Sequence, residues 1–520
     1  MPRRPIPPRP SLEFDRKQAR ALLEAVRRGD ADAVERFRTH HPRFRSSAVA
    51  HPALHDAQLV IAREYGVASW PRWKQLVEIR QLEARERAAL LVRAACAGDM
   101  RQASTLLAAD PALERFDLYT ACVSGADGEV ARRLARDPAL ARGRGGPLDR
   151  EPILYACFSR FLRSDARRAP GIVRVVRLLL DHDADVNAHF LHQDGSETWV
   201  QTSLYGAAGI ANNAELTRML LEADADVNEL HGEPGNGAES CGLEALYHAS
   251  EFADVTCLRL LLEARPPLHP KRVSYCLARM VDFENRAGVE LYLRHGADPN
   301  FRIPWMHDRT HLHRAVVYGR SLPIVRLLVE AGGDPNARDD LGFTPFRSAV
   351  RNGREDVARH LLGAGADEAS LTGDDRTRDG LDPDVLCYAA GRNDVTEVRR
   401  LLGAGADPNA LGGLDETPPL HWAVWRGSAD AARLLVEGGA DIHQINRYGG
   451  DALDTAIHGS LNCHDVFGGI GMKLPEEIDH GDYPAIVELL MAAGARLPRQ
   501  VTGSEAVQDV LRRAGAPDGE

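Results

Sequence analysis

The chain has 520 residues, more than one compact hydrophobic core usually supports, so we expect several domains or one elongated repeat array. Acidic residues outnumber lysine and arginine by 75 to 64, and the net charge of −11 disfavours binding to nucleic acid or to an anionic membrane. No run of about 18 apolar residues occurs and the cysteines form no Cys-x-x-Cys pair, which argues against a spanning helix, a disulfide scaffold and a Cys-based zinc site. We expect a cytoplasmic protein.

The N-terminal part is expected to contain a tail and a helical segment. The proline-rich, basic start MPRRPIPPRP predicts a disordered tail at 1–10, and residues 11–84 are expected to be helical. Within them, residues 56–76 are predicted to form two helices broken at Gly66 and Pro71. His51 and His55, with Asp56 nearby, could share one helix face, but we favour capping or surface roles because no further metal ligands are identifiable.

Repeated blocks organise the rest of the chain. Residues 85–150 are predicted to form divergent helix pairs, at 91–113 and 117–140. Residues 151–500 return to the pattern Leu-Leu-x-x-Gly-Ala-Asp-x-Asn, as in LLEADADVN, LVEAGGDPN and LLGAGADPN, and the Asn position recurs every 31 to 55 residues. A second block precedes most copies, as in TPFRSAVRNG and PPLHWAVWRG. These features predict an array of repeated units at 151–500, followed by a capping helix and tail at 501–520.

One unit shows why the pattern predicts a helix hairpin. Thr-Pro at 344–345 suits the start of a first helix, where threonine can cap free N–H groups and proline loses no hydrogen bond. Leu361 and Leu362, with Val357 one turn earlier, are predicted to form the apolar stripe of a second helix. Gly365 follows where that helix should end in the left-handed conformation. Because one hairpin cannot bury its apolar face alone, neighbouring units must stack.

Together the two blocks resemble the ankyrin repeat, and several registered copies occur. The resemblance implies an all-α solenoid of stacked helix hairpins with short β-hairpin tips, preceded here by the helical N-terminal segment. It also implies that a concave face, lined by first helices and hairpin tips, binds other proteins. Residues 56–76 resemble an N-terminal segment of bacterial ankyrin proteins, a resemblance that implies no chemistry.

The resemblance implies that partners bind at two places in each repeat: the two residues before the glycine that follows the first helix, and the hairpin after the Asn position. The residues before this glycine give the predicted partner-binding residues Tyr318, Arg351, Asn352, Trp425 and Arg426. Glu251 and Phe252 are added because they align with these positions in a repeat that lacks the glycine. Exposed aromatic and arginine side chains dominate the binding energy of protein interfaces. Solvation is the alternative for Arg351 and Asn352, and packing against a neighbouring unit is the alternative for Phe252. We expect Trp422 in the core and Trp425 outward.

Two stretches suggest metal binding. HDRTHLH at 307–313 is similar to the zinc motif HExxH, but the repeat register puts His313 in a first helix and His307 in the preceding hairpin, so we favour structural roles. The longest insertion, 461–481, follows His458 and contains Cys463, His464 and His480, residue types that suit a transition metal. Their spacing matches no metal-site pattern, so we favour a flexible polar loop and predict no metal site.

The chain contains no phosphate-binding loop, nucleophile elbow or dinucleotide-binding fingerprint. We therefore predict neither catalysis nor a cofactor. The leading hypothesis is an intracellular scaffold that binds another protein through its concave face, with no membrane contact. The competing hypothesis is a metal-dependent enzyme or effector that uses the insertion at 461–481.

Overall fold

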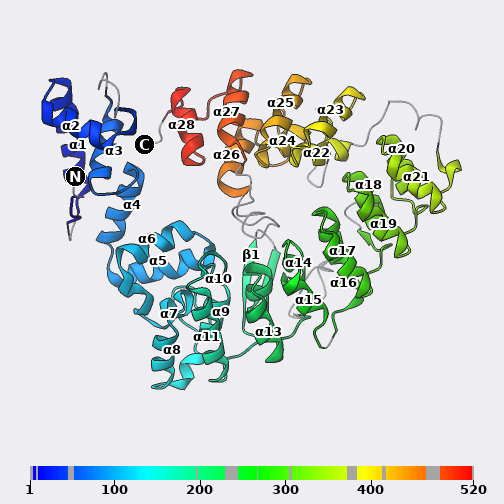
Figure 1. The fold of residues 1–520 in the computed structure, drawn as a ribbon, viewed down its shortest axis with the longest axis horizontal. Helices are drawn as coiled ribbons and strands as arrows, with labels where there is room; N and C mark the ends of the chain where they lie inside the picture. The colour runs from blue at the N-terminus through cyan, green and yellow to red at the C-terminus, as the bar shows by residue number, and fades with distance from the viewer. Residues whose placement is uncertain are drawn as a thin grey trace. The chain divides into compact units, whose positions relative to one another are not determined.

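The computed structural model describes residues 4–7, 10–44, 52–194, 197–228, 244–265, 267–303, 307–371, 383–412, 417–463 and 481–517. Helices dominate these residues and strands are few, which confirms the predicted fold class (Figure 1). The chain divides into two compact units, residues 1–185 (unit 1) and residues 186–520 (unit 2). Across the described ranges, no helix has the length and apolar character needed to cross a membrane.

Unit 1 begins with a helical bundle that has its own core. Its helices are α1 (Leu12–Arg27), α2 (Ala31–His40), α3 (Leu54–Glu64) and α4 (Trp70–Gln81). The carboxylate of Asp15 is buried in this core and accepts hydrogen bonds from the hydroxyl of Tyr65 (3.1 Å) and Nε1 of Trp73 (3.0 Å). These two rings stack 4.1 Å apart. Because a buried carboxylate is costly without donors, the two aromatic side chains explain how Asp15 is tolerated there.

The structure bears on two predictions for this region, the tail at 1–10 and the roles of His51 and His55. The backbone N–H of Arg4 donates to the carbonyl of Glu64 (2.9 Å), so this part of the predicted tail lies against α3. His51 lies outside the described residues. Asp56 is buried and its carboxylate accepts a hydrogen bond from the N–H of Ala53 (2.8 Å). His55 is largely exposed, in agreement with the surface role expected for it.

The remainder of unit 1 consists of helix pairs. They are α5 (Ala84–Ala97) and α6 (Met100–Ala109), α7 (Leu118–Ser124) and α8 (Asp127–Leu134), and α9 (Pro152–Cys157), α10 (Phe161–Ser164) and α11 (Ala169–Leu180). First helices pack on first helices, α5 on α7 and α7 on α9. The helix pairs expected at 91–113 and 117–140 are therefore present. The boundaries predicted at 84 and 150 both fall inside unit 1.

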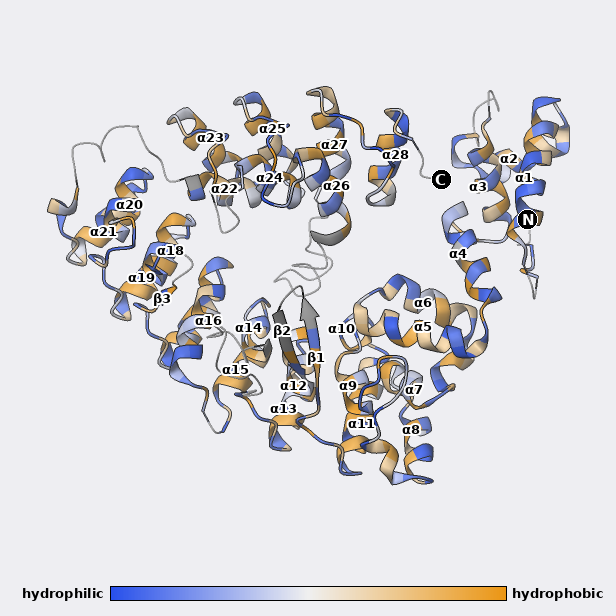
Figure 2. Ribbon diagram, turned by 180° about the vertical axis from the view of Figure 1, so that it is seen from behind, coloured by the Kyte–Doolittle hydropathy of each residue, from blue (hydrophilic) through white to orange (hydrophobic). Residues whose placement is uncertain are grey.

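Unit 2 is a stack of helix hairpins. Its pairs are α12 (Ser203–Tyr205) and α13 (Ala214–Glu222), α14 (Glu244–Ala249) and α15 (Thr256–Leu262), α16 (Pro270–Asp282) and α17 (Arg286–Arg294), α18 (His311–Val317) and α19 (Leu322–Glu330), α20 (Pro345–Arg351) and α21 (Glu355–Gly363), α22 (Pro383–Gly391) and α23 (Val395–Gly403), α24 (Pro419–Trp425) and α25 (Ala429–Glu437), and α26 (Ala452–Cys463) and α27 (Tyr483–Ala492), followed by α28 (Glu505–Arg513). First helices pack on first helices and second helices on second helices, for example α24 on α26 and α25 on α27. Apolar residues gather where helices pack (Figure 2).

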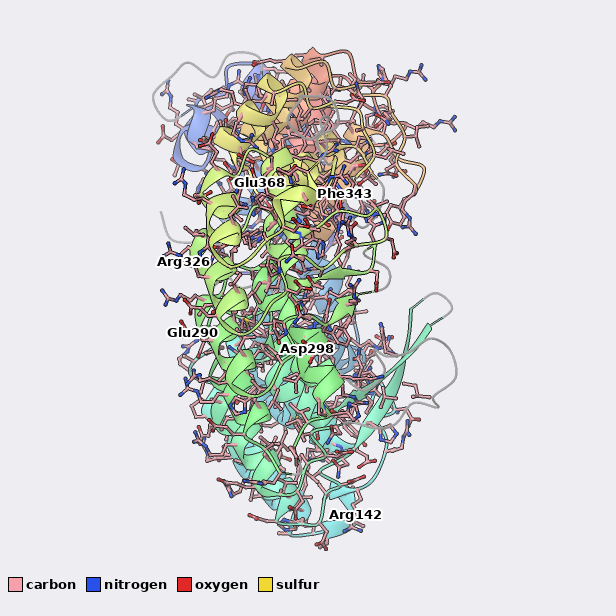
Figure 3. The ribbon with its side chains drawn as sticks, turned by 90° about the vertical axis from the view of Figure 1, so that its right-hand side faces the viewer. Arg142, Glu290, Asp298, Arg326, Phe343 and Glu368 are labelled. Atoms are coloured by element: carbon pink, nitrogen blue, oxygen red, sulfur yellow. The ribbon has the colours of Figure 1, made fainter. Side chains whose placement is uncertain are left out.

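Short loops, here called fingers, join each second helix to the next first helix. Two fingers contain antiparallel strands: β1 (His189–Asp194) pairs with β2 (Glu197–Thr202), and β3 (Arg302–Ile303) pairs with β4 (Arg309–Thr310). They match the predicted β-hairpin tips. Figure 3 shows Glu290 and Arg326 of the second helices on one side of the stack, and Asp298 and Phe343 of the fingers on the other. We call the side formed by first helices and fingers of unit 2 the first-helix face.

The unit analysed in the sequence forms as predicted, with one exception. Thr344 caps α20 by accepting a hydrogen bond from the N–H of Arg347 (3.0 Å), and Gly365 ends α21 with φ +93°. Leu361 is fully buried in the stripe of α21. Leu362 is 40% exposed, so its assignment to the stripe is wrong. It follows Leu361 by one residue, and a helix turns about 100° per residue, which carries its side chain off the packed face.

The recurring asparagines join consecutive units. Asn300, Asn336 and Asn409 each accept a hydrogen bond from the N–H of the aspartate that starts the next finger (2.7 Å in all three cases). Each also donates from Nδ2 to the carbonyl of the glycine that ends the next second helix, at 2.9, 2.9 and 3.1 Å. We call these bonds the asparagine ladder. It explains physically why asparagine recurs at the marker position.

Candidate functional site

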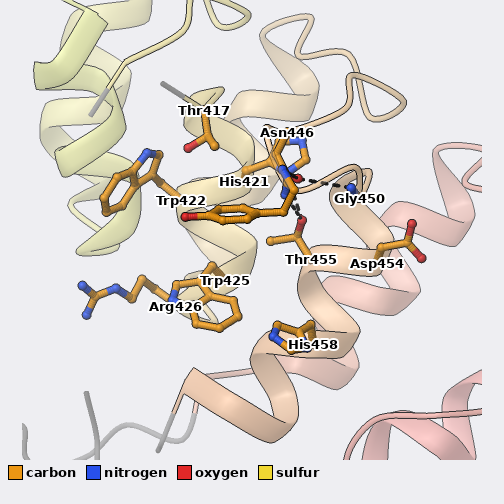
Figure 4. A pocket seen from close by; sticks show the side chains of 11 residues that line it. Thr417, His421, Trp422, Trp425, Arg426, Asn446, Gly450, Asp454, Thr455 and His458 are labelled. Carbon is orange, nitrogen blue, oxygen red and sulfur yellow. Dashed lines mark hydrogen bonds between the residues drawn. The ribbon is translucent and has the colours of Figure 1, made fainter. Parts of the chain in front are cut away.

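A pocket of about 580 Å³ opens on the first-helix face between α24, α26 and the finger that joins α25 to α26 (Figure 4). Its size falls within the range of roughly 300–1,000 Å³ that is common for ligand sites. We call it the aromatic pocket. Its lining residues are Thr417, His421, Trp422, Trp425, Arg426, Asn446, Tyr448, Gly450, Asp454, Thr455 and His458.

A buried hydrogen-bond network holds the finger against the two helices. Nε2 of His421, in α24, donates to the carbonyl of Gln444 (2.9 Å), so its Nδ1 is left as an acceptor in the neutral ring. The hydroxyl of Thr455, in α26, lies 2.9 Å from that Nδ1, and Nδ2 of Asn446 donates to the same hydroxyl (3.0 Å). Burial lowers the pKa of His421, which keeps the ring neutral and the network intact.

The same asparagine closes the turn of the finger. Oδ1 of Asn446 accepts hydrogen bonds from the N–H groups of Tyr448 (2.9 Å) and Gly450 (3.1 Å). Tyr448 is thereby held at the tip, where it is 72% exposed while still lining the pocket. The network therefore holds the backbone of an exposed aromatic residue on a loop that is tied to two helices.

The backbone of Trp425 is fixed by the following repeat. Its carbonyl accepts a hydrogen bond from the hydroxyl of Tyr483 (2.8 Å). Gly459 permits the close approach of α26, because a Cβ at this position would lie 2.7 Å from the same carbonyl oxygen. The ring of Trp425 stacks on His458 at 5.4 Å, with 30° between the planes. An aromatic platform is therefore built before any partner arrives.

The pocket combines aromatic walls with one charge of each sign. Trp422, Trp425 and Tyr448 supply the aromatic surface. Arg426 and Asp454 lie on opposite sides of it (Figure 4). Asp454 is exposed, and its Oδ2 accepts a long hydrogen bond from the N–H of Asp451 (3.4 Å). Such a pocket can hold a side chain that has an apolar stem and a polar or charged end.

The structure brings together four residues named from the sequence. Trp422, Trp425, Arg426 and His458 all line the aromatic pocket. Trp422 and Trp425 are both half-buried, so the expected contrast between a core and an outward tryptophan is wrong. Sequence reasoning missed Tyr448 and Asp454. The hairpin after the Asn position was a candidate region and contains Tyr448, but no pattern marked Asp454.

Two other predicted residues, Tyr318 and Asn352, are buried, so the prediction of an exposed position is wrong for both. Tyr318 is only 3% exposed because Tyr388 packs against it, with the two hydroxyls 2.8 Å apart. Asn352 is 1% exposed, and its carbonyl accepts a hydrogen bond from Nη2 of Arg400 (2.6 Å). Neighbouring repeats thus cover the end of these two first helices.

The pair Glu251 and Phe252 is also buried, at 4% and 3% exposure. Glu251 forms an ion pair with Arg279 and accepts from Nδ1 of His248 (3.1 Å). The carbonyl of Phe252 accepts a hydrogen bond from Nδ2 of Asn285 (3.3 Å). Packing against the neighbouring unit, the alternative considered for Phe252, describes both residues.

Arg351 is half-buried and lies outside the aromatic pocket. Its guanidinium carbon lies 4.9 Å from the centre of the Phe343 ring, a residue of the preceding finger. Arg347, one helical turn earlier, lies 4.5 Å from the same ring. Cation–π contact with its own finger therefore occupies Arg351, while a role in partner binding stays a prediction.

The histidine motif at 307–313 has structural roles. Nε2 of His313 donates to the carbonyl of Phe343 (3.0 Å), and Nε2 of His311 donates to that of Ser274 (2.8 Å). Burial lowers the pKa of each ring to about 4. His307 lies in the preceding finger with a positive φ of 55°. The described residues contain no group of three potential ligands placed to hold a metal ion.

His464 and His480 lie outside the described residues, as does the side chain of Cys463. His458 lines the aromatic pocket and stacks on Trp425. The expectation that these four residues form no metal site therefore stays a prediction.

Comparison with known proteins places this stack in a family. A profile of ankyrin repeats matches residues 277–370 and 386–467. Over 125 residues the chain is 38% identical to cyclin-dependent kinase 4 inhibitor B of Bos taurus, covering 24% of this chain and 92% of that protein. The chain belongs to the ankyrin-repeat family.

Two human relatives add to this comparison. The chain is 43% identical over 74 residues to protein phosphatase 1 regulatory subunit 27, covering 14% of this chain and 47% of that protein. It is 30% identical over 216 residues to ankyrin repeat and SOCS box protein 6, covering 41% of this chain and 42% of that protein. The chain thus spans less than half the length of these two relatives. All three relatives are mammalian, so the expected bacterial character is not borne out.

Proposed function

We propose that this ankyrin-repeat protein binds a partner protein through the first-helix face of unit 2, with the aromatic pocket at the centre of the contact. The observation that carries the proposal is the partly exposed aromatic surface of Trp425 and Tyr448 beside Arg426. Tryptophan, tyrosine and arginine are the residue types that contribute most to interface energies. Ankyrin repeats act in protein–protein interaction as a family, and two relatives are named as a regulatory subunit and an inhibitor.

Preorganisation supports the same proposal. The N–H of Tyr448 donates to Asn446 and the hydroxyl of Tyr483 donates to the carbonyl of Trp425, so the backbone of both aromatic residues is held in place. A partner would therefore lose little free energy in ordering this backbone, and more of the contact energy would remain as affinity.

The test is capture of partners by the full chain and by variants. We expect Trp425→Ala to weaken the captured complex by about 2 kcal/mol or more, measured by titration calorimetry with the partner identified by mass spectrometry. Tyr448→Ala should weaken it as well, and because this side chain is 72% exposed its loss should leave the fold intact. Equal thermal unfolding of variant and parent is required, since lost stacking would imitate lost contact.

A matched control is Arg433→Ala. Arg433 is exposed on α25, the second helix of the repeat that holds Arg426, and does not line the pocket. Arg426→Ala should reduce affinity and Arg433→Ala should leave it unchanged. Retention of every partner by a folded triple variant at Trp425, Arg426 and Tyr448 would show that the contact lies elsewhere.

A further inference from the structure

The aromatic pocket has the features of a cation-binding site. Its walls include Trp422, Trp425 and Tyr448, three aromatic side chains whose ring faces carry partial negative charge. Tryptophan and tyrosine are the best partners for a lysine or arginine cation placed over the ring. From this we infer that the pocket receives a positively charged side chain of an extended segment of the partner, an inference that rests on the function proposed above.

The charges that line the pocket favour the same occupant. Asp454 is the carboxylate of the lining, and it lies on the first turn of α26. Arg426 is on the opposite side of the pocket (Figure 4), so a guest cation can approach Asp454 while staying remote from Arg426. An acidic guest would have to enter between aromatic faces that repel it, with Arg426 as its counter-charge. The aromatic walls and Asp454 therefore both attract a cation, whereas for an anion the repulsion from both opposes the attraction of Arg426.

Apolar finger tips beside the pocket define what flanks the cation. Leu411 is 53% exposed in the finger before α24, and Ile445 is 63% exposed in the finger before α26. The two fingers are joined, because Nε2 of Gln444 donates to the carbonyl of Asn409 (3.2 Å). Large apolar side chains exposed on adjoining fingers favour apolar contact with a partner. The partner segment is thus a basic residue with apolar neighbours.

Three short peptides test this inference. The full chain is titrated with N-acetylated, C-amidated Ala-Leu-Arg-Leu-Ala and with its Gln and Glu counterparts at the arginine position. Binding is followed through the indole N–H signals in the NMR spectrum. The arginine peptide should bind at least about fivefold more tightly than the glutamine peptide, and the glutamate peptide most weakly. Equal affinities, or a preference for glutamate, would overturn the inference.

Variants assign the preference to the pocket. Asp454→Asn should remove most of the difference between the arginine and glutamine peptides while leaving binding of the glutamine peptide unchanged. Asp430→Asn is the matched control, because Asp430 is exposed on the first turn of α25, outside the pocket. Tyr448→Ala should weaken the arginine peptide most. If Asp454→Asn and Asp430→Asn behave alike, Asp454 does not receive the cation.

The two proposals fail in distinguishable ways. If Trp425→Ala no longer captures the partner but the peptides show no charge preference, the proposed binding face is supported and the cationic guest is contradicted. If the charge preference depends on Asp454 but the pocket variants still capture the partner, the cation site is supported and the proposed binding face is contradicted.

Discussion

At the residue scale, one register position separates a buried leucine from an exposed one. Leu361 is fully buried in α21, whereas Leu362 is 40% exposed. Leu361→Ala should lower the free energy of unfolding by about 2–5 kcal/mol, because it removes buried methyl groups and leaves a cavity. Leu362→Ala should lower the free energy of unfolding by well under half of the loss in Leu361→Ala. Urea denaturation of both variants measures the difference, and equal losses would contradict the register of this repeat.

Gly365 allows the free-energy cost of a left-handed backbone conformation to be measured separately from side-chain clashes. It has φ +93°, and a Cβ added there would meet nothing within 4 Å. Gly365→Ala should therefore destabilise the chain by roughly 1 kcal/mol through left-handed strain alone. Gly363, which is helical and equally open to a Cβ, is the matched control, and Gly363→Ala should be neutral or stabilising. Thermal unfolding compares the two, and a loss that is larger for Gly363→Ala would contradict the assignment.

At the element scale, buried histidines tie first helices to neighbouring backbone. His311 and His313 donate to the carbonyls of Ser274 and Phe343, and burial lowers the pKa of both rings from 6.5 to about 4. The folded state therefore binds fewer protons than the unfolded state between these pH values. The contribution of the two neutral rings to the free energy of unfolding is therefore fully present above pH 6.5 and is lost as the pH falls towards 4.

The expected outcome is a fall in the free energy of unfolding as the pH is lowered from about 6.5 to about 4. For His311 this loss is on the order of 3 kcal/mol at most. Chemical denaturation at several pH values measures it. His311→Gln should flatten the dependence, whereas His443→Gln, at an exposed finger position, should leave it unchanged. An identical slope in the His311 variant would show that this ring does not drive the pH dependence.

Element positions were predictable because helix starts and stops depend on local chemistry. The Thr-Pro start at 344–345 and Gly365 lie where capping rules place them. The predicted exposure of Tyr318 and Asn352 failed for a non-local reason. Tyr388 and Arg400, in later repeats, cover them. The aromatic pocket was only partly predictable, since Trp425 recurs in register but Asp454 joins it only once two repeats have stacked.

At the scale of the whole molecule, the asparagine ladder couples one repeat to the next. Asn409→Ala would remove the bonds to the N–H of Asp441 and the carbonyl of Gly439. We expect a loss of about 1–2 kcal/mol in the free energy of unfolding. Native-state hydrogen exchange should show the loss on both flanking repeats, residues 383–409 and 419–450. Protection that falls in only one of them would contradict coupling through this residue.

The asparagine ladder leaves the outer part of a finger free to vary, while the asparagine itself must stay constant. At Asn300, Asn336 and Asn409 the ladder uses one asparagine side chain and two main-chain groups of the next unit, and none of these bonds involves a side chain of the finger beyond the asparagine. The part of a finger beyond the asparagine, such as β3 and β4 after Asn300, can therefore differ in length and sequence while the ladder bonds stay in place. Fingers should accept grafted loops, so that new recognition can be installed on an unchanged frame.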